Sequence, residues 1–178
     1  MDLLIHKTRK GDQEAFIKLM EINKQAMYKT AKAILRNDED VADAMQETIL
    51  ACYTNINKLE KSKYFKTWLI KILINKCNDI VRKNKNILCV AEVEEGSYCD
   101  DFTENINLRE SFNHLGKNYD LLMTLYYIHE FNIREISNML DLNENTVKTR
   151  LSRGREYFKN AYLKCDEGGL TYEQRSGR

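Results

Sequence analysis

The chain has 178 residues, of which 43% are hydrophobic and 31% are charged, with seven glycines and no proline. This composition is typical of a mainly helical soluble protein with one or two small domains. No apolar run approaches the roughly 18 residues that a membrane-spanning helix needs, and the first residues show no signal-peptide pattern. We therefore expect a cytoplasmic protein with no membrane insertion of its own.

The net charge of +1 hides an uneven distribution along the chain. Residues 1–86 contain 17 basic and 11 acidic residues, residues 87–111 contain 1 and 7, and residues 112–178 contain 10 and 9. An acidic strip of this kind is typical of a solvated linker, either a plain spacer or a segment that lies against a positive surface. The predicted organisation is a domain at 1–86, a flexible acidic linker at 87–108, a second domain at 109–166 and a tail at 167–178.

Two amphipathic helices are predicted in the first domain. Apolar residues recur at helical spacing from Asp12 to Arg36, and a second helix follows, for which Asp38 is the expected N-cap. Its buried stripe is expected at Val41, Met45, Ile49, Cys52 and Ile56. The opposite face places carboxylates around a leucine, with Asp40, Asp43, Gln46, Glu47, Leu50 and Thr54. Such a face is either simply solvated or docks on a basic protein surface.

The third predicted helix, from Tyr64 to Lys85, has aromatic and basic residues on one face. Its apolar stripe is wide enough for a three-helix core and consists of Leu69, Ile70, Leu73, Ile74, Cys77 and Ile80. The opposite face consists of Tyr64, Trp68, Lys71, Asn75, Asn78 and Arg82. Because bases stack on rings and cations meet phosphates, this face fits single-stranded nucleic acid. The alternative is that Trp68 completes the core.

The segment from Ile133 to Lys159 predicts a helix-turn-helix with a basic second helix. Apolar residues keep helical spacing up to Leu140, a short turn follows, and Asn143 is expected to cap the second helix. Val147 and Leu151 mark its buried side. The opposite side and its flanks consist of Asn145, Lys148, Thr149, Arg150, Ser152 and Arg153. Such a unit indicates DNA binding, although a solvated basic helix remains the alternative.

Neither a metal site nor a catalytic site is predicted. The five cysteines are widely spaced, and no histidine is placed to complete a zinc set. Cys52 and Cys77 fall on apolar helix faces and are expected in the core, whereas Cys89 and Cys99 flank the acidic strip, where a redox pair stays open. No nucleophile, paired-carboxylate or phosphate-loop pattern is found, so we expect no enzyme activity and no cofactor.

Four sequence blocks occur in a fixed order: GDQEAFIKLM, LRNDEDVADAMQETIL, FKTWLIKILINKCNDIVRK and the helix-turn-helix. Together they resemble the extracytoplasmic-function (ECF) sigma factors of bacterial RNA polymerase, over nearly all of residues 11–161. The resemblance implies an all-α fold with two small helical domains, sigma region 2 and sigma region 4. It implies promoter-specific transcription initiation, with core RNA polymerase, promoter DNA and a dedicated anti-sigma factor as partners.

The resemblance also assigns three sets of residues to these partners. The core-polymerase set is Asp40, Asp43, Gln46, Glu47 and Leu50. The minus-ten set, which would hold the melted non-template strand, is Lys61, Lys63, Tyr64, Phe65, Trp68, Lys71, Asn75 and Arg82. The minus-thirty-five set, which would read duplex DNA, is Asn145, Thr146, Lys148, Thr149, Arg150, Ser152 and Arg153.

A stand-alone helix-turn-helix regulator that makes no polymerase contact is the alternative function. Such a regulator needs neither the acidic face of the second helix nor the aromatic and basic face of the third. The sequence therefore favours a sigma factor, whose second domain alone is expected to bind duplex DNA weakly and to gain affinity from its tether.

Overall fold

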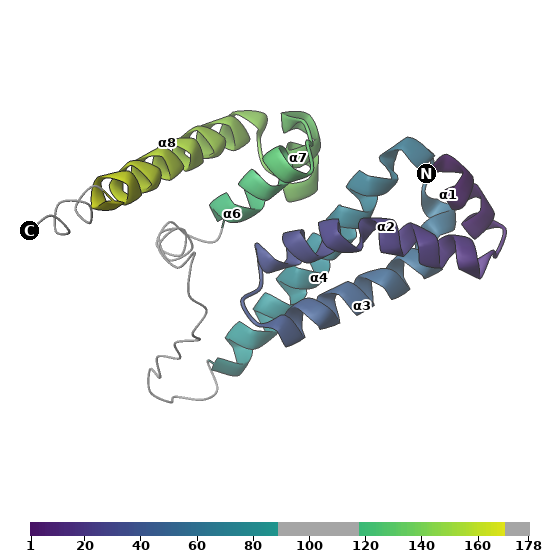
Figure 1. The fold of residues 1–178 in the computed structure, drawn as a ribbon. Helices are drawn as coiled ribbons and strands as arrows, with labels where there is room; N and C mark the ends of the chain where they lie inside the picture. Colours follow the sequence, from purple (N-terminus) through teal and green to yellow (C-terminus); the bar gives the residue numbers. More distant parts are fainter. Residues whose placement is uncertain (89–117, 170–178) are drawn as a thin grey trace, which may run out of the picture.

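The computed structural model describes residues 1–88 and 118–169, and every regular element in these two ranges is helical (Figure 1). The N-terminal unit consists of α1 (Asp2–Arg9), α2 (Gln13–Lys32), α3 (Asp38–Asn55), the short 3-10 helices η1 (Ile56–Lys58) and η2 (Ser62–Tyr64), and α4 (Phe65–Leu88). The C-terminal unit consists of α6 (Asn118–Met123), the π-helical turn η3 (Thr124–Ile128), α7 (Ile133–Leu140) and α8 (Glu144–Gly169). Among the helices described, none combines the length and apolar character that crossing a bilayer requires.

The core of the N-terminal unit lies between α2, α3 and α4, which run side by side (Figure 1). The predicted stripe of α4 is buried from Leu69 to Cys77, and α2 contributes Leu19 and Met27 to the same core. Burying each large apolar side chain contributes about 1.5–3 kcal/mol, so this stripe is the main reason that the three helices pack together. The three-helix core expected from the sequence is confirmed.

The beginnings of α2 and α3 show which residues cap them. Asp12 accepts a hydrogen bond from the Ala15 amide at 3.0 Å. At α3 the expected cap was wrong: Asn37 is the N-cap and accepts from the Glu39 amide at 3.0 Å. Asp38 is the first residue of the helix, and its carboxylate instead pairs with Lys32 at 2.7 Å.

The sequence did not predict α1, which packs against α2 and η1. This helix is short and buries only Ile5 and Thr8, so its periodicity was too weak to recognise. The Arg9 guanidinium donates to the backbone carbonyls of Ile56 and Leu59, just before α4 begins. The N-terminal helix therefore holds the segment that leads into α4.

The helix-turn-helix of the C-terminal unit is confirmed. Asn132 and Glu135 form a reciprocal capping box at the start of α7. Asp141 ends α7 in the left-handed conformation, with a φ of 52°, and Asn143 accepts from the Asn145 amide at 2.8 Å, as the sequence predicted. Val147 lies in the core of this unit, so α8 faces α6 and α7 with its apolar side.

Parts of the predicted domain plan lie outside the described residues. These are positions 89–108 of the acidic linker, including Cys89 and Cys99, and most of the tail. Residues 87–88 belong to the end of α4, and α8 continues to Gly169, beyond the predicted domain boundary at 166. The domain boundaries stay predictions.

Candidate protein-docking and nucleic-acid surfaces

The acidic face of α3 is exposed as expected. Asp43, Gln46 and Glu47 are exposed, Asp40 is half-buried, and the apolar side chain of Leu50 is 67% exposed. The opposite side of α3 is buried through Val41, Ala44, Thr48 and Cys52, whereas Met45 and Ile49 of the predicted stripe are only partly buried. Leu50 lies outside the core of this unit, so its side chain is accessible to a partner.

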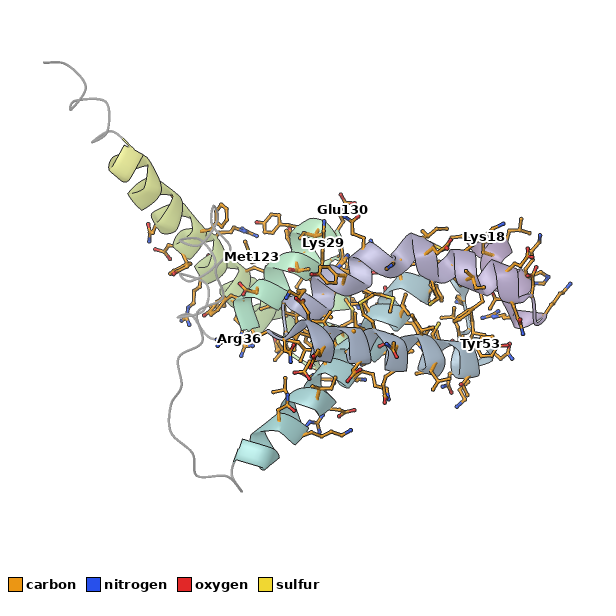
Figure 2. All side chains as sticks on the ribbon, turned by 60° about the horizontal axis from the view of Figure 1, so that its bottom comes forward. Lys18, Lys29, Arg36, Tyr53, Met123 and Glu130 are labelled. Carbon is orange, nitrogen blue, oxygen red and sulfur yellow. The ribbon has the colours of Figure 1, made fainter. Side chains whose placement is uncertain are left out.

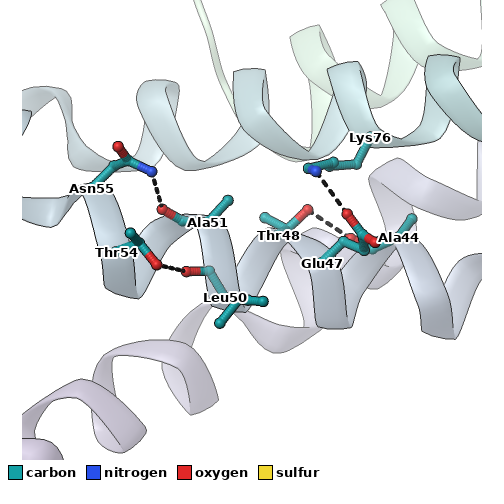
Figure 3. A network of polar contacts seen from close by, with 8 residues as sticks. All are labelled: Ala44, Glu47, Thr48, Leu50, Ala51, Thr54, Asn55 and Lys76. Atoms are coloured by element: carbon teal, nitrogen blue, oxygen red, sulfur yellow. Dashed lines mark hydrogen bonds and ion pairs between the residues drawn. The ribbon is translucent and has the colours of Figure 1, made fainter.

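Two carboxylates of this face are also joined to α4. Glu47 Oε2 lies 2.7 Å from Lys76 Nζ (Figure 3), and Asn84 donates to Asp40 at 3.1 Å. The hydrogen bond and the charge of Lys76 lower the pKa of Glu47. Both contacts are at the surface, so each adds little stability. Asp43 is thus the better residue for testing the charge of this face alone.

Three further polar side chains of α3, which follow Glu47 along the helix, bond within α3 itself (Figure 3). Thr48 donates to the Ala44 carbonyl at 2.7 Å, Thr54 to the Leu50 carbonyl at 2.9 Å, and Asn55 to the Ala51 carbonyl at 2.9 Å. The hydroxyl protons of the two threonines are therefore already used within the helix. The carboxylates and Leu50 remain the groups of this face that a partner would meet.

An exposed strip of basic and aromatic residues runs from η2 along α4. Lys61, Lys63, Asn75 and Arg82 are exposed, and the Tyr64 ring is 48% exposed with Lys63 Nζ 4.8 Å from its centroid. A cation beside an accessible ring provides both a stacking surface for a base and a charge for a phosphate. The α4 residues of this strip lie on the face opposite the buried stripe, as the spacing predicted.

Two predicted members of the minus-ten set belong wholly or partly to the core. Phe65 is 1% exposed, so a base could stack on its ring only if the core opened, and we leave Phe65 out of the proposed contacts. Trp68 is half-buried, packs against the core, and lies 6.2 Å from the Phe65 ring between centroids. The core reading of Trp68 therefore holds in part, because its side chain packs against the core and stays partly exposed, whereas its contact with DNA stays a prediction.

Lys71, which was predicted to contact DNA, contacts the C-terminal unit in this structure. Its ammonium donates to the Asn138 carbonyl at 2.8 Å and lies 3.7 Å from the Asp141 carboxylate. The sequence did not predict this contact, since it joins residues far apart in the chain. Lys71 therefore lies both on the predicted minus-ten face and at the junction between the two units.

The outer face of α8 carries the predicted minus-thirty-five set. Its exposed members are Asn145, Lys148, Thr149, Ser152 and Arg153, and its half-buried members are Thr146 and Arg150. Val147 and Leu151 hold the opposite side against the unit, and Gly154 lets α6 approach closely. A helix with cations and short polar side chains on its free side is suited to a DNA groove.

Within residues 1–88 and 118–169, no three His, Cys, Asp or Glu side chains gather as metal ligands would. Cys52 and Cys77 are both fully buried, which confirms the predicted core role, and burial raises the pKa of each thiol to about 12. At neutral pH both thiols are protonated and therefore poor nucleophiles.

No role for His129 was predicted from the amino-acid sequence. This residue is 4% exposed, and its Nε2 lies 2.8 Å from the hydroxyl oxygen of Thr30 in α2. In the sequence, His129 is an isolated histidine next to an apolar run. This is the one feature that could have suggested a buried role, and it is a weak signal.

Comparison with known proteins assigns both units to one family. Residues 19–87 match the family model of sigma-70 region 2, and residues 106–157 match that of sigma-70 region 4. SigW, an ECF RNA polymerase sigma factor of Bacillus subtilis (strain 168), is 30% identical over 178 aligned positions, which cover 88% of this chain and 95% of SigW.

Solved structures show the same fold. CnrH, solved in complex with the cytosolic domain of CnrY, is similar with a TM-score of 0.66 and 22% identity over 92% of this chain and 97% of that chain. RpoE of Bartonella quintana, solved in complex with the anti-sigma factor NepR, has a TM-score of 0.72 and 18% identity over 83% of this chain and 96% of that chain. Because both region models match in order and SigW is covered almost end to end, the chain belongs to the ECF sigma factors of RNA polymerase.

Proposed function

We propose that this chain directs core RNA polymerase to its promoters through three separate surfaces and performs no chemistry itself. The observation that carries the proposal is the pair of exposed faces on the N-terminal unit. An acidic face with Leu50 lies on α3, and a basic and aromatic strip lies on α4. A stand-alone helix-turn-helix regulator would need neither face.

The polymerase-docking surface of the proposal is the α3 face. Asp43 and Gln46 would meet a basic surface on the largest polymerase subunit, with Leu50 buried at the centre of the contact. Carboxylates around one apolar side chain suit this task, since charge speeds encounter while apolar burial stabilises the complex. Asp40 and Glu47 contribute charge to the same face while remaining bonded to α4.

The minus-ten surface of the proposal is the strip from η2 along α4. Tyr64 and the accessible edge of Trp68 would stack on unpaired bases, and cations would meet the phosphates of the non-template strand. Stacking contributes about 1–3 kcal/mol per base, so one or two captured bases can shift the melting equilibrium without ATP. The basic residues assigned here are Lys61, Lys63, Lys71 and Arg82.

The minus-thirty-five surface of the proposal is the outer face of α8. The helix would enter the major groove from its N-terminus, with Asn145 and Thr149 near base edges. Lys148, Arg150 and Arg153 would contact phosphates, which position the helix without reading sequence. Tethering to a unit that is fixed on polymerase raises the effective concentration of this face near its site.

Control by an anti-sigma factor is part of the proposal. It is supported by the likeness to CnrH and RpoE, which were solved with the cytosolic domain of CnrY and the anti-sigma factor NepR. We propose the cytoplasm as the site of action, because a sigma factor must meet polymerase and promoter DNA there.

Binding to core polymerase tests the proposal, with Asp43→Lys as the variant. Reversing this exposed charge should weaken core binding about tenfold or more, because like charges would meet in the contact. The matched control is Glu21→Lys, which makes the same charge change at an exposed position of α2. Asp43 is preferred to Glu47, because Glu47 pairs with Lys76 of α4. Replacing Glu47 by lysine would also break this pair and bring two positive charges together.

Transcription in vitro completes the test. Core polymerase with the wild-type chain should give a start-site-specific transcript from a promoter of the source organism, and Asp43→Lys should reduce that transcript. Absence of a specific transcript from every such promoter would refute the proposal. Tight, specific binding of promoter duplex by the chain without polymerase would favour the stand-alone regulator instead.

A further inference from the structure

The loop between η3 and α7 is inserted against the N-terminal unit. On the α2 side, His129 Nε2 lies 2.8 Å from the Thr30 hydroxyl, and both residues are almost fully buried. Thr30 also bonds to the Ala26 carbonyl at 3.0 Å. A hydroxyl has one proton, so the assignment that fits both bonds has Thr30 donating to Ala26 and accepting from the Nε2–H of His129.

On the α4 side, Lys66 holds the same loop. Its Nζ donates to the His129 carbonyl at 3.1 Å and lies 5.3 Å from the centroid of the Phe131 ring. Glu130, between these two residues, has a backbone φ of 58°, a value that residues other than glycine rarely adopt. His129 and Phe131, on either side of it, are both buried, and Glu130 is labelled in Figure 2.

A third contact joins α4 to the end of α7. Lys71 donates to the Asn138 carbonyl at 2.8 Å and lies 3.7 Å from the Asp141 carboxylate. A cation is favoured there, because the C-terminus of a helix carries partial negative charge. The end of α7 and the turn that follows it therefore bind Lys71, which belongs to the proposed minus-ten surface.

We propose that this junction is a self-inhibitory clasp: a closed state that must open before Lys71 of α4 can meet the non-template strand. The inference rests on the proposed function, from which Lys71 takes its role in binding DNA. The block is selective, since Lys148 and Arg153 on the outer face of α8 stay exposed in the closed state. The closed chain thus keeps its duplex-reading face accessible while part of its minus-ten face is covered.

The clasp is suited to reversible opening. Besides the buried His129 and Phe131 it has few polar contacts, and its Lys71–Asp141 pair is largely exposed, with side chains 42% and 85% accessible. Contacts between domains commonly permit relative motion unless the interface is large and hydrophobic. Docking of the N-terminal unit on polymerase, with DNA competing for Lys71, would supply the free energy that opens the clasp.

Thr30→Val tests the clasp, because valine keeps the volume of threonine and removes the acceptor of His129. The matched control is Thr48→Val in α3, since Thr48 is equally buried and donates to a carbonyl four residues earlier in the same way. Both variants lose the bond within their own helix, so their difference isolates the contact with His129. Lys66→Met is a second variant, which keeps the side-chain stem and removes the ammonium.

The first measurement is the distance between spin labels on unnatural amino acids at the exposed positions Gln25 and Glu156, in the full chain without polymerase or DNA. Thr30→Val should raise the ratio of open to closed molecules about fivefold to tenfold, the range expected when a buried hydrogen bond is lost. Lys66→Met should also raise it, and Thr48→Val should match the wild type. An unchanged ratio in both Thr30→Val and Lys66→Met would overturn the clasp.

The second measurement is binding of a single-stranded non-template minus-ten oligonucleotide and, separately, of a minus-thirty-five duplex. Thr30→Val should bind the single strand more tightly by the same factor, with duplex binding unchanged. An open variant with unchanged single-strand affinity would overturn the inhibitory role. Failure of the proposed function looks different: the distances would still shift, but no form of the chain would support specific transcription with polymerase.

Discussion

Lowering the pH is expected to open the junction, because it protonates His129. Burial lowers the pKa of His129 to about 4, and the charges of Lys66 on α4 and Lys29 on α2 act in the same direction. In an open chain the imidazole would return to its ordinary pKa of about 6.5. The closed state therefore binds fewer protons than the open state, and it loses stability as the pH falls from about 6.5 towards 4.

The size of this effect follows from the two pKa values. Their difference of about 2.5 corresponds to a loss of roughly 3 kcal/mol in the stability of the closed state relative to the open state. This full loss is reached when His129 is protonated in both states. Between about pH 7.5 and 5.5 the ratio of open to closed molecules should rise about tenfold, and below about pH 4 it should stop rising.

The assay is the distance between labels at Gln25 and Glu156, recorded across this pH range in the wild type and in His129→Gln. A glutamine amide can donate to Thr30 but carries no charge, so the variant should remain closed at low pH. A tenfold change that persists in His129→Gln would refute this reasoning, because another group would then be titrating. A wild-type ratio that does not depend on pH would refute it as well.

Three further outcomes are expected. Asn132→Ala removes the capping box and should lower the free energy of unfolding of the C-terminal unit by about 1 kcal/mol in urea denaturation; no change would show that the cap is redundant. Gly154→Ala should be nearly neutral in the same assay, because gained helix propensity offsets a 3.3 Å approach to the flexible Met123 side chain, whereas Gly154→Leu should cost about 1–3 kcal/mol. Since the pKa of Cys52 and of Cys77 is raised to about 12, a thiol reagent at about pH 8 should modify them only after denaturation, as peptide mass spectrometry would show; rapid labelling of the native chain would contradict their burial.

The fold was largely predictable because its helices are long and amphipathic. The apolar stripe of α4 from Leu69 to Cys77 and the turn capped by Asn143 are local features, and a period of 3.6 residues or a cap is visible in a few consecutive positions. The short helix α1 lacks such a signal. Asn37 and Asp38 are equally good caps by residue type, so only the observed backbone separates them.

The exposed surfaces were predictable for the same reason. Once the buried stripe of a helix is known, the opposite face follows from the helical rotation, which placed Asp43, Leu50 and Lys148 in solvent. Aromatic residues were the exception. Phe65 and Tyr64 are adjacent and similar in type, yet one is in the core and the other is 48% exposed, because consecutive side chains of a helical segment point in different directions.

The helices, their buried and exposed faces, and the family to which their order belongs could be inferred from the amino-acid sequence, because each of these depends on residues close together in the chain. The way in which the two units meet could not be inferred in this way. The bond of Thr30 to His129 and that of Lys71 to Asn138 join residues separated by 99 and 67 positions. No local period records such pairs, so a buried histidine and a lysine shared between two surfaces became visible only when the units were placed together.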